Sequence, residues 1–314
     1  MDSLWQGLSE VTVPDILEKA LKTPFTNLAL KRNSYINRVF EVESQKGERL
    51  IAKFYRPGRW SASQIKEEHA FLNALAKAEL PVIEPLQFND KTLFEQHHFL
   101  FCLYPKKWGR SLDEFNESTW QQLGRLLGRV HVEGQHHKNS DRIKWTPAIA
   151  TEVHLAQILD YEVLPVGFEK PLEQVVRHLI HHFSAHFEHL DYFLIHGDCH
   201  RSNIISREGE GLFLIDFDDM CVGPAVQDLW MFLPDTLDKS RQELEWFLEG
   251  YETFRQFNHA ELKLIPALQA MRQIHYAAWC AVQSKDPDFA EHFPHFGTPS
   301  YWNELLRDLQ KLTN

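Results

Sequence analysis

The chain has 314 residues, of which 33 are basic and 44 acidic, so its formal net charge is −11. Charged residues make up 25% and apolar residues 43% of the chain, which is ordinary for a soluble globular protein. The acidic balance argues against a nucleic-acid partner, because binding nucleic acid needs a basic face. No stretch approaches the roughly 20 apolar residues that span a bilayer, and the chain does not open with a basic and apolar secretory signal. We therefore expect no membrane partner.

The cysteines indicate the compartment. None of the four stands in a C-x-x-C pair, a pattern that predicts reduced thiols and a cytoplasmic location. The 18 histidines are the unusual count, because histidine-rich chains invite a metal-site hypothesis.

The first third of the chain is predicted to be strand-rich, with one helix that begins at the N-cap Ser61. Strand, strand, helix, strand and strand are predicted over residues 39–42, 50–54, 61–77, 86–88 and 98–103. The rest is mainly helical, with helices predicted over residues 119–133, 172–190, 241–257, 261–283 and 299–312. We predict an α+β fold in which a β-rich lobe, residues 1–104, precedes a mainly helical lobe, residues 105–314.

The segment LIHGDCHRSNIISREGEGLFLIDFDD, residues 194–219, carries the candidate chemistry. Asn203 follows Asp198 by five positions, and Asp216 follows a second apolar run. A turn rich in glycine and charge separates the two apolar runs, so we expect a hairpin that brings all three side chains to one end. Such oxygen ligands suit Mg²⁺, which completes its shell with phosphate oxygens and water. Asp198 would then be free to accept a proton, an arrangement that protein kinases use.

The predicted small lobe supplies a matching cation. Lys53 lies in a predicted strand, like the kinase lysine that pairs with the α- and β-phosphates of ATP. Glu67 and Glu68 both fall in the following helix, and either could pair with it. We favour Glu68, because its spacing from Leu72 and Leu75 places it beside the buried stripe.

At this point a family resemblance is visible. The run I-H-G-D-C-H-R-S-N-I-I followed by I-D-F-D resembles the aminoglycoside phosphotransferase and choline kinase group of kinase-like enzymes. The segments NSYINRV, AKFYRPGRWSASQIKEEHAF, HGDCHRSNI and GPAVQDLWMFL are similar to a bacterial branch of that group, Ser/Thr protein kinases that act in stress response. The resemblance implies a bilobal protein-kinase-like fold, in which both lobes form one domain, and an ATP- and Mg²⁺-dependent kinase.

The resemblance also implies residue roles. Asp198 is the expected catalytic base toward the acceptor hydroxyl. Asn203 and Asp216 are the expected Mg²⁺ ligands, and Asp216 counts with Asp198 as catalytic. Lys53 is expected to grip the ATP phosphates, oriented by Glu68.

The sequence departs from the kinase pattern in the rest of the nucleotide site. The joint between the lobes near Leu103–Pro105 is the expected adenine hinge, with Leu103 as the expected nucleotide contact. No G-x-G-x-x-G loop precedes it, and the corresponding hairpin reads KRNSYINRVF. Ser34 and backbone N–H groups would then hold the phosphates, although an ordinary turn serine is an equal interpretation. The metal motif reads D-F-D and no A-P-E segment follows, so we expect no control by activation-loop phosphorylation.

Several polar neighbours have two interpretations. His196 and His200 flank Asp198, and we expect them to hold the shape of the loop rather than to react. Asp218 suits a second Mg²⁺ and a backbone hydrogen bond equally well. Asp228 is expected to cap a helix or to brace the catalytic loop.

The expected function is phosphate transfer from ATP to a Ser/Thr residue of a protein, by a monomer. The alternative is a small-molecule kinase that phosphorylates an amino alcohol or an aminoglycoside-like hydroxyl. A pseudokinase is disfavoured, because the lysine, both aspartates and the asparagine are intact. A zinc-binding protein is suggested by one helix face that carries His178, His182, His186 and His189. An apolar stripe adjoins this face, which favours a solvated helix edge instead.

Overall fold

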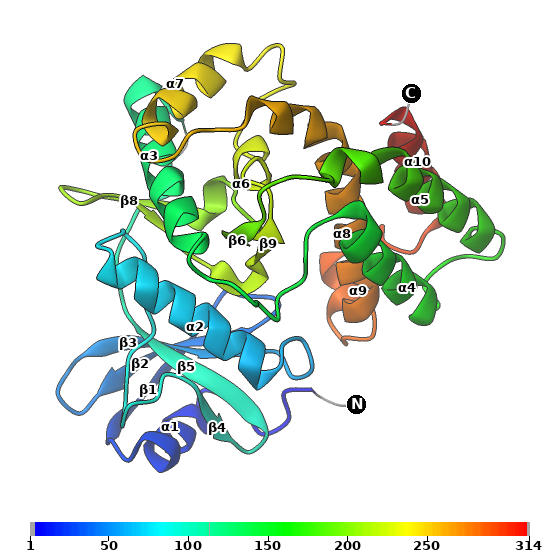
Figure 1. The fold of residues 1–314 in the computed structure, drawn as a ribbon. Coiled ribbons are helices and arrows are strands. Elements are labelled where there is room, and N and C mark those ends of the chain that lie inside the picture. Colours follow the sequence, from blue (N-terminus) through cyan, green and yellow to red (C-terminus); the bar gives the residue numbers. More distant parts are fainter. Residues whose placement is uncertain (1–3, 113, 313–314) are drawn as a thin grey trace.

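The structure, a computed structural model, describes residues 4–112 and 114–312. Its first third, blue to cyan in Figure 1, holds a five-stranded sheet, and the green to red remainder is mainly helical. This arrangement confirms the predicted α+β fold with a β-rich first part. No helix of the described residues is long and apolar enough to cross a membrane.

The sheet has the strand order β1-β2-β3-β5-β4, and all its neighbouring strands are antiparallel. Its strands are β1 (Phe25–Arg32), β2 (Arg38–Ser44), β3 (Arg49–Phe54), β4 (Phe94–Gln96) and β5 (Phe99–Pro105). The sequence prediction missed β1 and the preceding helix α1 (Val13–Leu21). Strand β1 lies at the sheet edge and buries only Phe25 and Ala29, so its apolar alternation is weak.

Two helices cover opposite faces of the sheet, as Figure 1 shows. Helix α1 shares an apolar cluster with Phe54 of β3. Because side chains alternate along a strand, the neighbouring Lys53 points to the other face, where α2 (Ala62–Lys77) lies. Helix α2 begins with the predicted N-cap, as the Ser61 side chain accepts a hydrogen bond from the backbone N–H of Gln64.

The predicted strand over residues 86–88 is wrong. The Leu86 N–H donates to the carbonyl of Leu103 (2.7 Å), but the chain then turns back at once. Asn89 and Asp90 both have positive φ, 50° and 60°, and close a tight turn between Phe88 and Lys91. Such a turn interrupts extended pairing, and the strand forms later, as β4.

Helices build the second part, and α3 and α7 cross at short range. A Cβ atom on Gly250 would lie 2.0 Å from the backbone oxygen of Gln121, so only glycine fits this crossing. The helices are α3 (Glu117–Gly134), α4 (Glu152–Asp160), α5 (Glu169–Ser184), α6 (Gln227–Trp230), α7 (Arg241–Tyr251), α8 (Ile265–Gln283), α9 (Phe289–His292) and α10 (Pro299–Lys311). Helices α5 and α7 end earlier than predicted.

Two short antiparallel pairs belong to the mainly helical part. Strand β6 (Phe193–Ile195) pairs with β9 (Cys221–Gly223), and β7 (Ile204–Arg207) pairs with β8 (Gly211–Leu214). The second pair is the predicted hairpin. The N–H of Ile215 donates to the carbonyl of Asn203 (3.0 Å), so the two loops that flank the hairpin meet at one end.

Candidate active site

A cavity of about 290 Å³ lies between the sheet and the β7–β8 hairpin, and we call it the lysine cavity. Lys53 Nζ lies 3.5 Å from Asp216 Oδ1 and 3.9 Å from Glu68 Oε1. It lies closer still to Asp218. Glu67 points elsewhere, because its carboxylate accepts the backbone N–H of Asp141 (3.1 Å). The structure therefore brings Lys53, Glu68 and Asp216 together and leaves Glu67 out.

Lys53, Glu68 and Asp218 are buried in this ion cluster, so each charge shifts the pKa of its neighbours. Burial lowers the pKa of Lys53, but Asp218 and Glu68 more than offset this effect, so the pKa lies above its usual value. Burial raises the pKa of Asp218, yet Lys53 and Arg59 together lower it below its usual value. Burial raises the pKa of Glu68. Lys53 and Asp218 therefore form an ion pair across the two parts of the chain.

Ser34 lies in the turn between β1 and β2 and lines the lysine cavity. It also lines a second cavity of about 310 Å³, the aspartate cavity, with Asp198. Leu103 is fully buried and does not line the lysine cavity, whereas the next two residues, Tyr104 and Pro105, do. The predicted joint, Leu103–Pro105, therefore reaches this cavity through Tyr104 and Pro105 and not through Leu103.

Asp198 is held from two sides. Its Oδ2 lies 3.3 Å from His200 Nε2, and its Oδ1 lies 2.7 Å from Arg272 Nη2 of α8. Burial raises the pKa of Asp198, but the hydrogen bond from His200 and the charge of Arg272 outweigh burial and lower the pKa well below its usual value. Asp198 is therefore ionised at neutral pH. His200 contacts the Asp198 carboxylate directly, which the loop-shaping interpretation alone did not anticipate.

Hydrogen bonds to Asp228 fix the loop around Asp198. Asp228 accepts the backbone N–H groups of His196 and Gly197 (both 2.8 Å) and lies 3.1 Å from His131 Nε2. The His196 ring in turn reaches the carbonyl of Ile215 (2.9 Å) and thereby links both loops. These contacts support the bracing interpretation of both residues.

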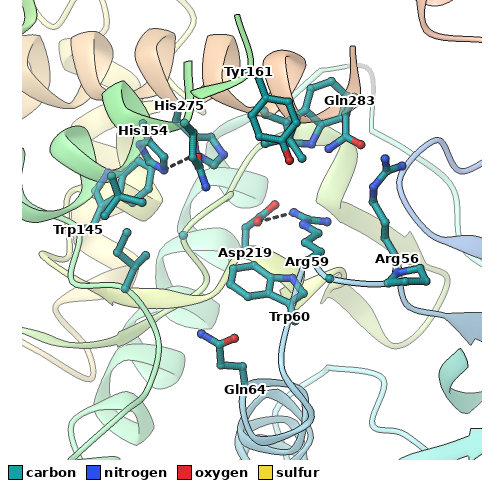
Figure 2. Close-up of a pocket in the computed structure, with 18 of the residues that line it drawn as sticks. Arg56, Arg59, Trp60, Gln64, Trp145, His154, Tyr161, Asp219, His275 and Gln283 are labelled. Atoms are coloured by element: carbon teal, nitrogen blue, oxygen red, sulfur yellow. Dashed lines mark hydrogen bonds and ion pairs between the residues drawn. The ribbon is translucent and has the colours of Figure 1, made fainter. Parts of the chain in front are cut away.

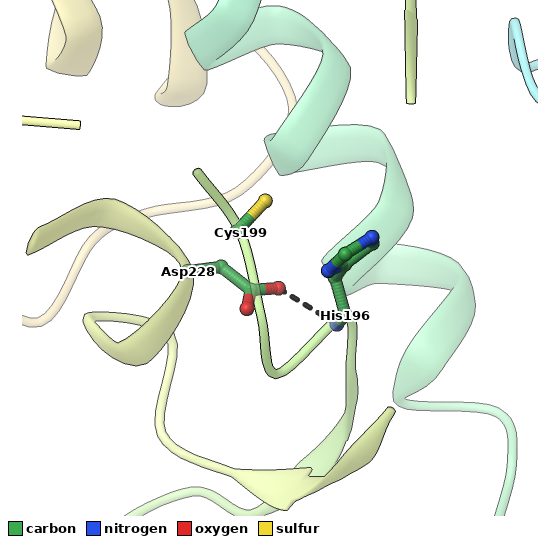
Figure 3. Close-up of side chains that lie close together, drawn as sticks. All are labelled: His196, Cys199 and Asp228. Carbon is green, nitrogen blue, oxygen red and sulfur yellow. Dashed lines mark hydrogen bonds between the residues drawn. The ribbon is translucent and has the colours of Figure 1, made fainter. Parts of the chain in front are cut away.

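His196, Cys199 and Asp228 lie close enough together to suggest a metal site (Figure 3). Asp228 already has three N–H partners, and burial raises the pKa of the Cys199 thiol, so no thiolate is ready to bind zinc. We interpret this cluster as structural. In the described part of the chain, the histidine row on α5 does not gather three ligand atoms within range of one ion.

Two backbone features orient the side chains of Asn203 and Asp216, the predicted metal ligands. Asn203 Nδ2 donates to the carbonyl of Asp198 (2.9 Å), which fixes the side-chain amide of Asn203. Asp216 has φ 63°, an uncommon left-handed conformation, and its side chain is 56% exposed, unlike the buried Asp218. Gly197 also has positive φ, and a Cβ there would lie 2.3 Å from the carbonyl oxygen of Asp219. The strained backbone therefore turns the Asp216 carboxylate into the cavity rather than into the core.

Sequence reasoning missed four polar residues of the site. Asn37, from the turn after β1, donates to Asp218 Oδ2 (2.6 Å). The other three are the arginines Arg59, Arg142 and Arg272. Arg59 stands in a segment that carries the family resemblance but had been given no role. Arg142 and Arg272 lie outside every motif, so no local signal pointed to them.

Arg59 and Arg142 both bind the loop after β8. Arg59 donates to Asp219 (2.6 Å). Arg142 donates to the carbonyl of Asp218 (2.7 Å), and its second nitrogen lies 3.4 Å from Glu68. Helix α2 and the loop that carries Asp216 are therefore tied together through a buried arginine.

The largest of the cavities near the site, about 560 Å³, adjoins the aspartate cavity, and we call it the arginine pocket (Figure 2). Figure 2 shows the Arg59–Asp219 pair at its centre and Tyr161 and Gln283 on one side. Shared lining residues connect the three spaces in series. Ser34, Asn37 and Asp216 line both the lysine and the aspartate cavities. Five residues line both the aspartate cavity and the arginine pocket, namely Arg59, Asp219, Arg272, His275 and Trp279.

A sheet with a buried lysine–glutamate pair, set above an Asp–Asn loop and a second aspartate, is the arrangement of kinase-like phosphotransferases. Residues 30–265 match the phosphotransferase enzyme family (APH), and the chain belongs to this family. It is therefore an ATP-dependent phosphotransferase.

Known relatives agree with this assignment. The chain is 38% identical over 275 residues to stress response kinase A of Escherichia coli K12, covering 86% of this chain and 82% of that protein. It is 36% identical over 278 residues to the serine/threonine protein kinase RdoA of Salmonella typhimurium LT2, with the same coverage. The structure of the amicoumacin kinase hAmiN, in complex with AMP-PNP, Ca²⁺ and Ami, shares the fold with a TM-score of 0.72 and 20% identity, covering 91% of this chain and 87% of that one.

Proposed function

We propose that this phosphotransferase moves the γ-phosphoryl group of ATP to Ser/Thr hydroxyls of proteins, with Asp198 as the catalytic base. The observation that supports it is the series of connected cavities. A nucleotide in the lysine cavity, with its phosphates beside Lys53 and the Ser34 turn, would direct its last phosphate into the aspartate cavity. An acceptor in the arginine pocket would reach Asp198 from the opposite side. Loose phosphoryl transition states need such positioning more than covalent help.

Within this proposal Lys53 holds the phosphates and Glu68 orients it. Tyr104 and Pro105 form the edge of the cavity where the adenine would lie, next to the predicted Leu103. Lys53 pairs with Asp218, so a phosphate oxygen beside Lys53 would share this cation with that carboxylate. Four unpaired cysteines are consistent with a cytoplasmic enzyme.

The donor set around Asp216 fits Mg²⁺. Asp216 offers a half-exposed carboxylate beside Asp218, and the fixed amide of Asn203 offers a carbonyl oxygen in the adjoining loop. Hard oxygen donors of this kind, with room for phosphate and water, are what Mg²⁺ requires. Asn203 and Asp216 would hold the ion, which would neutralise the phosphate charge. An Asp216→Ala variant should lose Mg²⁺-dependent ATP binding at equilibrium, and unchanged binding would contradict this role.

The charges of the arginine pocket favour a protein acceptor over a polycationic small molecule. Its lining includes Arg56, Arg59 and Arg272 but only two carboxylates, Asp141 and Asp219. A polycationic antibiotic needs an excess of free carboxylates for its amines, whereas this lining has more arginines than carboxylates, and each arginine is paired with an aspartate. The name of the Salmonella relative, a serine/threonine protein kinase, supports the same acceptor class.

One observation favours the alternative of a small amino alcohol. Aromatic rings are prominent in the pocket wall, and such rings attract cationic groups. The rings belong to Trp60, Trp145, Tyr161 and Trp279. Both acceptor classes can be tested together in one assay.

The test is incubation of the purified chain with Mg²⁺ and ATP labelled at the γ-phosphate, together with dephosphorylated casein and a panel of aminoglycosides and amino alcohols. We expect label on protein seryl or threonyl residues, and label on an amine instead would replace the proposed acceptor class. Asp198→Asn should bind ATP normally but lose transfer by about 10²–10⁴-fold, the range typical of a general base. Near-normal turnover by this variant would refute the assignment of Asp198.

A further inference from the structure

Helix α8 presents one face to the cavities of the site. Arg272 stands three and four residues before His275 and Tyr276, and Trp279 stands four and three residues after them, so all four lie on the same side of the helix. All four line the aspartate cavity. Arg272 also lines the arginine pocket, so it lies where the two spaces join.

The contact between Arg272 and Asp198 is close but is not a directed hydrogen bond. Arg272 Nη2 lies 2.7 Å from Asp198 Oδ1, yet this buried oxygen accepts no hydrogen bond from the described residues. The other oxygen, Oδ2, is already occupied by His200. Arg272 therefore covers the one carboxylate oxygen that an acceptor hydroxyl could use.

Arg272 is also the site cation with the greatest freedom to move. Lys53 and Arg59 are 11% and 15% exposed, and each contacts more than one carboxylate. The Arg272 side chain is 29% exposed, and Asp198 is its one ion-pair partner among the described residues. Moving Arg272 therefore disturbs the fewest buried contacts.

We propose that Arg272 is a further catalytic residue, which leaves Asp198 Oδ1 to the acceptor hydroxyl and binds the oxygens of the phosphoryl group during transfer. The proposal rests on the proposed function only in taking Asp198 as the base. The acceptor oxygen forms a bond to the γ-phosphorus while the bond from that phosphorus to the bridging oxygen breaks. The hydroxyl proton passes to Asp198 and ADP leaves. In this loose transition state negative charge is spread over the three equatorial oxygens and grows on the leaving oxygen, and an arginine supplied by the same chain stabilises that charge.

The test compares full-length wild type with Arg272→Ala and Arg272→Lys. Arg241→Ala is the matched control, because Arg241, the first residue of α7, is highly exposed and its ion pair joins it to the neighbouring, exposed Asp238. Each protein is assayed for binding of Mg–ATP and for turnover of labelled ATP, with casein and with water as the acceptor. Binding of ADP is then measured with Mg²⁺ and aluminium fluoride, which imitates the phosphoryl group in the transition state. Circular dichroism checks folding.

We expect Arg272→Ala to bind Mg–ATP within about threefold of wild type and to lose roughly 10²–10³-fold in kcat. It should also lose the tightening of ADP binding by aluminium fluoride. Arg272→Lys should retain part of the turnover and part of the aluminium fluoride effect. Millimolar guanidinium should partly restore the turnover of Arg272→Ala but should not change the turnover of Arg241→Ala. The proposal is overturned if kcat stays within threefold, or if the whole loss lies in Mg–ATP affinity.

The acceptor assignment and the role of Arg272 can fail separately. Wild type that labels neither protein nor amine would contradict the proposed acceptor, whereas hydrolysis and the aluminium fluoride measurement need no such acceptor. If those two readings are unchanged in Arg272→Ala, the inference about Arg272 is wrong whatever the acceptor is.

Discussion

His154 on α4 and His275 on α8 form a pair at the wall of the arginine pocket (Figure 2), and we expect this pair to make the fold sensitive to acid. Their ring nitrogens lie 3.0 Å apart. Burial lowers the pKa of His154 from 6.5 to about 2, and burial lowers that of His275 from 6.5 to about 4. Above pH 6.5 both rings are neutral in the folded and unfolded chains, so the pair adds no pH dependence there.

Below pH 6.5 the unfolded chain takes up protons at these two positions and the folded chain does not. The free energy of unfolding therefore falls as the pH falls. Each histidine contributes about 1.4 kcal/mol per pH unit. For His275 the window runs from 6.5 down to about 4, which amounts to roughly 3 kcal/mol. This is a substantial part of the stability of about 5–15 kcal/mol that is usual for a domain.

Urea unfolding between pH 7.5 and 4.5, followed by circular dichroism, measures this loss. Comparing wild type with the double variant His154→Gln/His275→Gln cancels the contributions of other titrating groups to the pH dependence. One of these is Glu68, whose raised pKa changes the free energy of unfolding with pH in the opposite direction. Wild type should lose at least about 2 kcal/mol more than the double variant between pH 6.5 and 4.5. His178→Gln, on the exposed face of α5, should follow wild type. Parallel losses in wild type and the double variant would refute the reasoning.

Three further outcomes are expected. Glu68→Gln should lower kcat/KM for ATP at least about tenfold, because Lys53 loses a buried partner. Glu67→Gln should stay within about twofold, and equal effects of the two variants would exclude the pairing of Glu68 with Lys53. Gly250→Ala should lower the free energy of unfolding by about 3 kcal/mol in urea titrations, because the new Cβ meets the Gln121 backbone, whereas helix propensity alone predicts a gain of about 1 kcal/mol. All four cysteines are buried and unpaired, so a chromogenic thiol reagent should label the native protein only as fast as it unfolds; immediate labelling would contradict this burial.

The local parts of the site could be predicted from sequence. The loop of Asp198 and Asn203, the hairpin and Asp216 lie within a few residues of one another, so turn residues and apolar runs determine their arrangement. The choice of Glu68 over Glu67 follows from helical period, and the structure places Glu68 3.9 Å from Lys53 while Glu67 contacts Asp141. Their catalytic roles remain predictions that the variants above test.

One-residue details were less predictable. Near the end of β5 the sequence pointed to Leu103, but Tyr104 and Pro105 line the lysine cavity. Successive side chains on a strand face opposite sides, so an error of one residue exchanges a buried side chain for a cavity-lining one. Likewise, the tight turn at Asn89 and Asp90 interrupts the strand predicted over residues 86–88, and the next strand forms later, as β4.

By itself the sequence determined the α+β order of elements, the kinase-like constellation and the family, because these depend on spacing along the chain. Only the tertiary structure decided which distant cations meet these carboxylates. Arg142 reaches Asp218 and Glu68, and Arg272 reaches Asp198, from segments that carry no motif of their own. Such contacts depend on how helices pack, and an isolated arginine in a helical pattern resembles any solvated side chain until the packing places it beside a buried charge.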